Sequence, residues 1–193
     1  MLKIGLTGGI GVGKTTVAKI FESFGIPVFY SDVESKNLMF DSQIKTQVIE
    51  LFGEESYSLD QLNRKHIAAQ LFEDPQKRTS LEALLHPRVR QEFQKWASNQ
   101  NTPYVLNESA LIFEKNLESY FDKIILVKAP LDLRISRVME RDKLTKAEVQ
   151  ARLAAQDNSS KNEDLSDFVI YNDNLSNLKL ICKDIHNKLT QKL

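Results

Sequence analysis

The sequence predicts an α/β fold of three layers, with a central parallel β-sheet between helices, and three observations lead to this class. Short apolar runs typical of buried strands alternate with longer segments of helical spacing. The first strand, helix and second strand fit into about thirty residues, the length of a βαβ unit with a right-handed crossover. A stretch without strand patterns, residues 32–101, interrupts the alternation. We therefore expect one domain over residues 1–193, in which a core of residues 1–31 and 102–193 carries a helical insertion.

Composition limits the classes of protein that this chain represents. Its 26 basic and 26 acidic side chains balance, so no overall field attracts nucleic acid or a membrane surface, and we expect neither as a partner. The single cysteine, Cys182, forms no internal disulfide, suits a reducing cytosol and lies in an apolar helical pattern typical of a buried residue. A strand pattern from Leu2 leaves no room for a signal peptide, and no apolar run approaches the roughly 18 residues of a membrane helix. We expect a cytoplasmic monomer or weak homo-oligomer.

The first strand runs into a glycine-rich loop that matches the pattern G-x-x-x-x-G-K-[ST] at Gly8, Gly13, Lys14 and Thr15. Glycine tolerates the positive φ angles that turn backbone N–H groups inward around a diphosphate, and the following helix points its positive end at the same anion. A glycine-rich turn without a ligand would not explain the lysine and threonine in register. We predict a P-loop NTPase fold in which Lys14 reaches the β- and γ-phosphates, Thr15 binds Mg²⁺, and the nucleotide contacts are Gly8, Gly9, Ile10, Gly11, Val12, Gly13, Lys14, Thr15 and Thr16.

An aspartate follows the second predicted strand. Helical spacing over residues 15–24 ends at Gly25, and residues 26–30 are a short apolar strand. Ligands of parallel sheets bind beyond the carboxyl ends of the strands. Asp32, two residues past Tyr30, is therefore expected at the phosphate site.

The insertion is predicted to be helical over residues 32–40, 42–52, 63–72 and 75–97, and in phosphate-loop kinases such an insertion usually holds the second substrate. Six basic side chains give it a positive component that suits an anionic group: Arg64, Lys65, His66, His86, Arg88 and Arg90. Most charges on exposed helices are only solvated, so the pattern alone assigns none of them to a ligand.

The third strand, residues 103–108, ends in Glu108, at the usual position of the acid that holds Mg²⁺ directly or through water. A helix cap or a surface acid is an equal alternative for Glu108. Residues 109–118 are expected to form a turn and a helix, and residues 123–128 are the clearest buried strand in the chain.

A pair of short helices after this strand carries several arginines. Residues 131–141 place Arg134, Arg137 and Arg141 on one helix face, and a capping box from Thr145 to Glu148 starts a second helix through residue 156. The pair, about residues 137–160, is either a lid that closes over a triphosphate or a surface hairpin held by salt bridges. Both interpretations remain open at this point.

The end of the chain completes the alternation. We expect a polar loop over residues 157–164, a strand over 168–171 and a closing helix over 175–189. Asn172 follows the strand, where its amide could bind the edge of a base, although asparagine in a turn needs no such reason.

Taken together, these segments resemble the dephospho-coenzyme A kinase family over nearly the whole chain. The phosphate loop resembles the family's L-T-G-G-I-G-S-G-K-S-T. Asp32 and further segments match in order: Leu62-Asn-Arg64, Leu84-Leu-His-Pro87, Leu111-Ile-Phe-Glu114, Arg137-Val-Met-Glu-Arg-Asp142, Arg152 with Gln156, and Asp167-Phe-Val-Ile-Tyr-Asn172. The chain departs from the family where D-A-D becomes Tyr30-Ser31-Asp32, where the proline of P-L-L-F-E becomes Ala110, and where Glu108 replaces a usual aspartate.

The resemblance implies that the γ-phosphoryl group of ATP, the co-substrate, moves to the ribose 3′-hydroxyl of dephospho-coenzyme A, the last step of coenzyme A biosynthesis. It implies Asp32 as the base, Arg137 and Arg141 as stabilisers of the transferring group, and Thr15 with Glu108 at Mg²⁺. Arg64 and His86 would bind dephospho-coenzyme A, and Asn172 would lie near the ATP base.

Two other functions use the same motifs. A kinase for a nucleoside, a nucleotide or another small alcohol would share this core, and a nucleotide-dependent switch would bind a protein partner and turn over slowly. The switch leaves Asp32 and the basic insertion unexplained. A nucleic-acid-dependent ATPase is disfavoured by the balanced charge and by the lack of a basic stripe interleaved with aromatic residues.

Overall fold

The computed structural model describes residues 1–59, 61–154 and 159–191. The chain divides into two compact units. The core unit comprises Met1–Tyr30 and Asn99–Leu193, and the inserted unit is Ser31–Ser98. Within the described residues, no helix is both long and apolar enough to cross a membrane.

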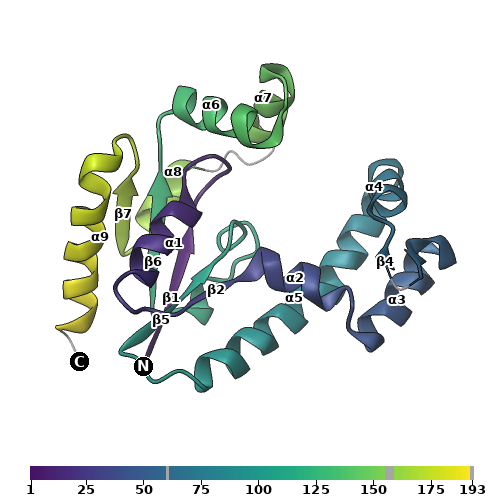
Figure 1. Ribbon diagram of the computed structural model, residues 1–193, viewed down its shortest axis with the longest axis horizontal. Coiled ribbons are helices and arrows are strands. Elements are labelled where there is room, and N and C mark those ends of the chain that lie inside the picture. Colours follow the sequence, from purple (N-terminus) through teal and green to yellow (C-terminus); the bar gives the residue numbers. More distant parts are fainter. Residues whose placement is uncertain (60, 155–158, 192–193) are drawn as a thin grey trace. The chain divides into compact units, whose positions relative to one another are not determined.

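The core unit is built on a five-stranded sheet in the order β2-β5-β1-β6-β7, in which every neighbouring pair is parallel (Figure 1). This confirms the predicted α/β class. The N-terminal strand lies at the centre of the sheet, so its carboxyl end opens between those of its two neighbours. The strands are β1 (Leu2–Thr7), β2 (Val28–Tyr30), β5 (Tyr104–Glu108), β6 (Lys123–Lys128) and β7 (Phe168–Tyr171).

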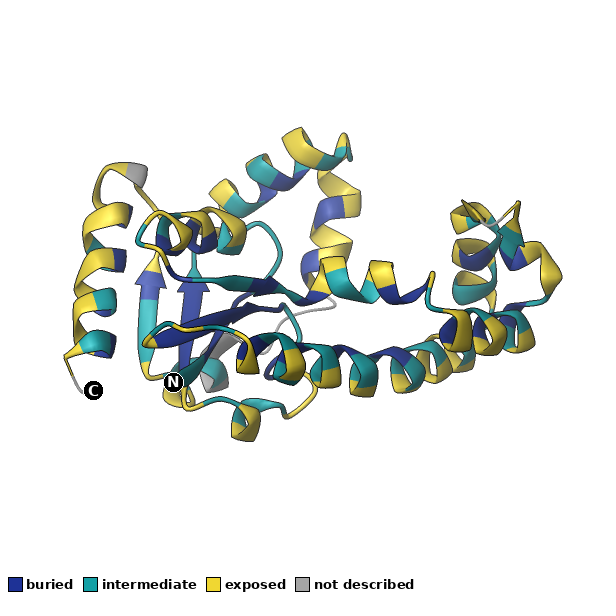
Figure 2. Cartoon of the chain, turned by 60° about the horizontal axis from the view of Figure 1, so that its bottom comes forward, coloured by how far each residue is buried: buried dark blue, intermediate teal, exposed yellow. Residues whose placement is uncertain are grey.

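Alternate residues of these strands face two different apolar layers. Ile4 and Leu6 of β1 pack in a cluster with helices α1 (Lys14–Glu22) and α9 (Leu175–Thr190). Figure 2 shows the strands coloured largely as buried, while the helices present exposed outer faces. Cys182 of α9 belongs to this cluster at 0% exposure, and burial raises the pKa of its thiol to about 12, which confirms its prediction as a buried residue.

The opposite face of the sheet is covered by residues 109–121. A turn and a helix were expected over residues 109–118; the turn is present, but in place of the helix the segment continues in successive turns, followed by the short 3₁₀ helix η2 (Glu118–Tyr120). The Ser109 hydroxyl accepts the N–H of Leu111, and Asn116 adopts a positive φ of 51°, which a helix does not allow. The turns bury Ile112 against β6, where the apolar pattern had suggested a helical face.

Three helices follow β6: α6 (Leu131–Asp142), α7 (Lys146–Ala154) and α8 (Ser159–Asp164). The first two pack through a small apolar cluster that contains Val138 and Val149. Part of the polar loop expected over residues 157–164 is α8, and residues 157–158 lie outside the described chain, as does Gln156. Glu163 of α8 pairs with Lys128 of β6 and accepts a hydrogen bond from the Tyr171 hydroxyl, so ion pairing rather than apolar periodicity attaches this helix.

The inserted unit is a set of helices arranged along one long helix. Helices α2 (Ser31–Leu38), α3 (Ser42–Phe52) and α4 (Arg64–Glu73) each pack against α5 (Pro75–Ser98). Leu85, Val89, Phe93 and Ala97 of α5 are buried at intervals of four residues, the spacing of a continuous helical stripe.

The inserted unit also contains a small sheet that the sequence does not predict. After the 3₁₀ helix η1 (Glu54–Ser56), strands β3 (Tyr57–Ser58) and β4 (Gln61–Leu62) pair antiparallel in a small separate sheet. Two residues per strand are too few to show an alternating pattern. The turn between them includes Leu59, which has a positive φ of 47° and is almost fully exposed, an unusual combination for a leucine.

Candidate active site

The loop between β1 and α1 has the backbone geometry of an anion cradle. Gly8, Gly11 and Gly13 have φ angles of 147°, 78° and 93°. An ideal Cβ on Gly8 would lie 2.3 Å from the carbonyl oxygen of Val127, so a side chain at this position is excluded by the backbone of β6. Gly13 is the N-cap of α1 and supplies no capping side chain, so an anion can take the place of a cap.

Lys14 and the threonines stand at the open side of this loop. The Lys14 ammonium group donates to the carbonyl oxygens of Gly8, at 2.8 Å, and of Gly9, at 3.3 Å. Its positive charge is thus held over the loop by the loop's own backbone. Thr15 and Thr16 are exposed on the first turn of α1.

Glu108 ends the strand beside the loop. It pairs with Leu6 of β1 and with Tyr30 of β2, and it is 7% exposed. Burial, a hydrogen bond with Glu22, and the charges of Glu22 and Glu108 raise the pKa of the Tyr30 hydroxyl to about 12. Glu108 is therefore a buried acid at the carboxyl edge of the sheet, not a surface acid.

The site offers oxygen donors of the type that Mg²⁺ prefers. Thr15 supplies a hydroxyl at the start of α1 and Glu108 a carboxylate at the end of β5. Within the described residues, no group of three or more acidic, histidine or cysteine side chains forms a complete metal site. The hydroxyl of Thr15 and the carboxylate of Glu108 therefore fit an ion that takes its remaining ligands from phosphate oxygens and water.

Arg134 covers the loop, a contact that the sequence reading did not assign. Its Nε donates to the carbonyl oxygen of Ile10 at 3.0 Å, and its Nη2 would lie 2.6 Å from an ideal Cβ on Gly9. Ile10 also packs against the apolar cluster of α6 and α7. The spacing of three residues between Arg134 and Arg137 was the available signal for a second arginine on this face.

Arg137 and Arg141 occupy different surroundings. Arg137 donates from Nη2 to the backbone carbonyl of Asn172 at 3.3 Å, and its Nη1 is buried with no partner among the described residues. Arg141 makes two hydrogen bonds with Asp142, at 2.7 and 2.9 Å, and Arg152 lies 3.5 Å from the same carboxylate. The bond from Arg141 lowers the pKa of Asp142. Helices α6 and α7 thus combine an arginine beside the loop with a salt-bridged outer surface.

Asn172 contacts the loop directly. Its Nδ2 donates to the carbonyl oxygen of Val12 at 2.8 Å, and the residue is 1% exposed. The side-chain oxygen Oδ1 is buried and has no partner among the described residues. The amide nitrogen that was expected near a base is therefore already engaged with the loop.

A cavity of about 270 Å³ adjoins the loop inside the core unit. Its lining includes Gly8 and Gly9 of the loop, Phe113 and Glu114 of the turn segment, and Arg134 of α6. A ligand there would contact the phosphate loop on one side and α6 and α7 on the other.

The residues predicted to handle the second substrate lie in the inserted unit. Asp32 is exposed in the first turn of α2, Arg64 is exposed at the first position of α4, and His86 is half-buried in α5. The structure thus assigns them to a different unit from the phosphate loop.

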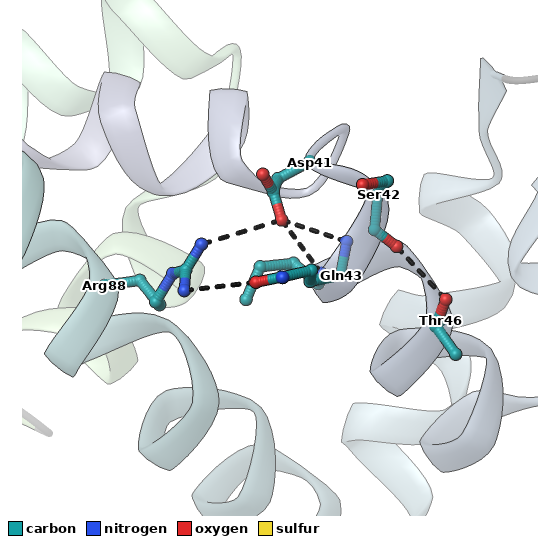
Figure 3. Close-up of polar contacts among 6 residues, drawn as sticks. Asp41, Ser42, Gln43, Thr46 and Arg88 are labelled. Atoms are coloured by element: carbon teal, nitrogen blue, oxygen red, sulfur yellow. Dashed lines mark hydrogen bonds and ion pairs between the residues drawn. The ribbon is translucent and has the colours of Figure 1, made fainter.

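Two other basic residues of the inserted unit have structural partners. Arg88 lies 3.8 Å from the Asp41 carboxylate and donates to Gln43 at 3.4 Å, which joins α5 to the start of α3 (Figure 3). The Nε2 of His66 lies 2.8 Å from the carbonyl oxygen of Phe52. These contacts hold the unit together without any ligand.

Comparisons with known proteins place the chain in a family. The family model for dephospho-CoA kinase matches residues 2–177. A dephospho-CoA kinase from Bacteroides fragilis is 35% identical over 89% of this chain and 85% of its own. One from Legionella pneumophila is 38% identical over 96% of this chain and 94% of its own.

A solved structure is similar to this chain over nearly its whole length. The crystal structure of a protein from Thermus thermophilus superposes with a TM-score of 0.86 at 33% identity, and it covers 98% of both chains. These findings confirm the resemblance that the sequence motifs suggested. This chain belongs to the dephospho-CoA kinase family, whose members are transferases that act in the last step of coenzyme A biosynthesis.

Proposed function

We propose that this chain transfers the γ-phosphoryl group of ATP to the ribose 3′-hydroxyl of dephospho-coenzyme A, with CoA and ADP as products. The observation that carries the proposal is the phosphate loop with Arg134 bonded to it and Arg137 bonded to the neighbouring Asn172, in a chain that matches the family over residues 2–177.

Nucleotide binding falls to residues of the core unit. The loop amides would hold the β- and γ-phosphates, and Lys14 would exchange its bonds to Gly8 and Gly9 for phosphate oxygens. Arg137 has a buried Nη1 without a partner among the described residues, and it would stabilise charge on the transferring group. Arg141 would first have to leave its bonds to Asp142.

Thr15 and Glu108 would hold Mg²⁺ at this site. When bound, the ion would supply positive charge that offsets the negative charge of the phosphates. The residues themselves contribute a hydroxyl and a carboxylate from adjacent elements of the core unit, and Glu108 is one methylene longer than the aspartate usual in the family.

The acceptor side of the reaction is assigned to the inserted unit. Asp32 would orient the 3′-hydroxyl and accept its proton, while Arg64 and His86 would bind dephospho-coenzyme A. Phosphoryl transfer has a loose transition state, so most of the catalytic effect is expected from positioning and from charge stabilisation.

Release of ADP, measured with a coupled assay, tests the reaction directly. Dephospho-coenzyme A is expected to accelerate ADP release, and Lys14→Ala is expected to remove the acceleration. Nucleosides, nucleotides and other small alcohols serve as competing acceptors. Faster turnover with one of these would replace the proposed acceptor, and no acceleration by any acceptor would favour a nucleotide-dependent switch.

Asp32→Asn tests the role of the base. The variant is expected to keep its affinity for ATP and to lose about 100-fold or more in kcat, because it retains the shape of the side chain but not its basicity. Glu34→Gln, a matched carboxyl-to-amide change in the same helix, serves as the control and should keep normal turnover. Unchanged turnover in Asp32→Asn would remove Asp32 from the mechanism.

The composition of the chain bears on its cellular location and on its state of association. The single cysteine suits the cytoplasm, and the balanced charge of 26 basic and 26 acidic residues gives no reason to invoke nucleic acid. We propose a cytoplasmic monomer or weak homo-oligomer, which sedimentation of the purified chain can check.

A further inference from the structure

Asn172, like Arg134, lies in the C-terminal third of the chain and donates a hydrogen bond from its side chain to a backbone carbonyl of the phosphate loop. It directly follows β7, and its backbone N–H donates to Lys128 of β6 at 2.7 Å. The backbone of Asn172 is therefore fixed by the neighbouring strand. Its side chain is buried and donates to the carbonyl oxygen of Val12 at 2.8 Å.

This bond sets the orientation of one peptide group in the loop. In a trans peptide the C=O and the N–H point in opposite directions. Because Asn172 holds the carbonyl of Val12, the N–H of Gly13 points to the opposite side of the backbone within the same peptide plane. Gly13 is the residue before α1, where loop N–H groups converge on an anion.

The fit around this peptide is close. An ideal Cβ on Gly13 would lie 2.2 Å from Nδ2 of Asn172, so only glycine leaves room for the bond. The backbone carbonyl of Asn172 also accepts a hydrogen bond from Arg137. One residue thus contacts both the loop and an arginine of α6.

We propose that Asn172 is a positioning residue for phosphate binding: its amide fixes the orientation of the Val12–Gly13 peptide, and its carbonyl anchors Arg137. The inference rests on the proposed function only in taking a nucleoside di- or triphosphate as the ligand. Its test uses nucleotide binding without an acceptor, so it can fail while the proposed reaction holds, and the reverse is also true.

A direct contact between Asn172 and the base would make a different prediction. Loss of such a contact weakens adenine nucleotides selectively. Loss of the bond to Val12 weakens every ligand with a polyphosphate by the same factor, because the loop binds phosphates and not bases.

The experiment measures displacement of a fluorescent ATP analogue by ADP, GDP and inorganic tripolyphosphate. Asn172→Ala removes the donor, and Asn172→Asp keeps its shape without an N–H to donate. We expect Asn172→Ala to bind all three ligands about tenfold more weakly, in line with the typical loss of a buried hydrogen bond. We expect at least the same loss in Asn172→Asp, where the added negative charge also opposes phosphate.

Asn174→Ala is the matched control for stability. Asn174 caps α9 by accepting the N–H of Ser176 at 2.9 Å, so its loss destabilises the protein without touching the loop. This variant should bind all three ligands as the wild type does. Hydrogen exchange of the unliganded protein adds a second measurement: residues 8–15 should exchange faster in Asn172→Ala, with the strands of the sheet unchanged.

Three results would overturn the proposal. The first is normal binding of all three ligands by Asn172→Ala. The second is a loss confined to ADP, which would assign Asn172 to the base. The third is an equal loss of binding in Asn174→Ala, which would reduce the effect to general destabilisation.

Discussion

Gly8 and Gly25 both have positive φ angles, of 147° and 80°, but they differ in what surrounds them. A Cβ on Gly8 would collide with the carbonyl oxygen of Val127, whereas a Cβ on Gly25 would meet nothing within 4 Å. The first glycine is required by a close approach of two backbone segments, the second only by its dihedral angles.

We therefore expect Gly8→Ala to be more harmful than Gly25→Ala. Gly25→Ala should cost about 1–2 kcal/mol of unfolding free energy from backbone strain alone. Gly8→Ala should lose about 1–3 kcal/mol more from overpacking and should also weaken ADP binding. Urea unfolding and ADP titration of both variants measure these effects, and equal losses would contradict the argument.

A single residue, His186, is expected to make the stability of the fold depend on pH. Burial lowers the pKa of its imidazole below the ordinary value of 6.5, and its Nδ1 lies 2.8 Å from the Tyr104 hydroxyl. Below about pH 6.5 the imidazole of His186 binds a proton in the unfolded chain, whereas in the folded chain it stays neutral until the pH is lower. This contribution to stability is therefore fully present above pH 6.5 and is lost as the pH falls toward the folded pKa.

The prediction is that the wild type loses more unfolding free energy than His186→Gln between pH 7.5 and pH 5.5. Urea unfolding of both proteins across this range gives the comparison. Parallel curves would show that His186 does not carry the dependence.

The start of α3 is the clearest case in which one residue stabilises a whole helix. Asp41 accepts the N–H groups of Gln43, at 3.0 Å, and Ile44, at 3.2 Å, and also approaches Arg88 of α5 (Figure 3). The carboxylate thus caps α3 and lies beside the helix that α3 packs against.

We expect Asp41→Ala to destabilise the protein by about 1 kcal/mol, because the helix loses its cap. Arg88→Met should cost less, about 0.2–1 kcal/mol, because the ion pair is partly exposed. Ser42→Ala is the control, because the contact of Ser42 with the Thr46 hydroxyl uses its backbone carbonyl, which alanine retains. Chemical unfolding ranks the three variants, and a larger loss for Arg88→Met than for Asp41→Ala would reverse the interpretation.

The sequence predicted correctly those elements whose apolar residues are spaced to face the core of the fold. Strand β6 and helix α9 are examples, since β6 buries its four central residues and α9 buries an apolar stripe that includes Leu178, Cys182 and Ile185. The turns of residues 109–117 were misread because Ile112 and Phe113 are buried by a chain reversal, which leaves an apolar pattern without a helix. Helix α8 was missed because its attachment is the pair between Glu163 and Lys128, 35 residues apart.

In the candidate site too, residues of a local motif could be predicted from the sequence, whereas contacts between distant segments could not. Gly8, Gly13, Lys14 and Thr15 could be recognised because their residue types and spacing form a motif within eight consecutive residues. The contacts of Arg134 with Ile10 and of Asn172 with Val12 span 124 and 160 residues, and no local pattern encodes them. The acceptor residues Asp32, Arg64 and His86 remain predictions that rest on the family.

The strand order also has a consequence for synthesis on the ribosome. β1 is made first, yet both of its neighbours, β5 and β6, are translated only after the inserted unit. At a translation rate of about 5–20 residues per second, the apolar segment that forms β1 remains without its neighbouring strands for on the order of ten seconds. Nascent chains stalled before Lys128 therefore cannot complete the sheet around β1, and that segment is a natural target for a chaperone during the delay.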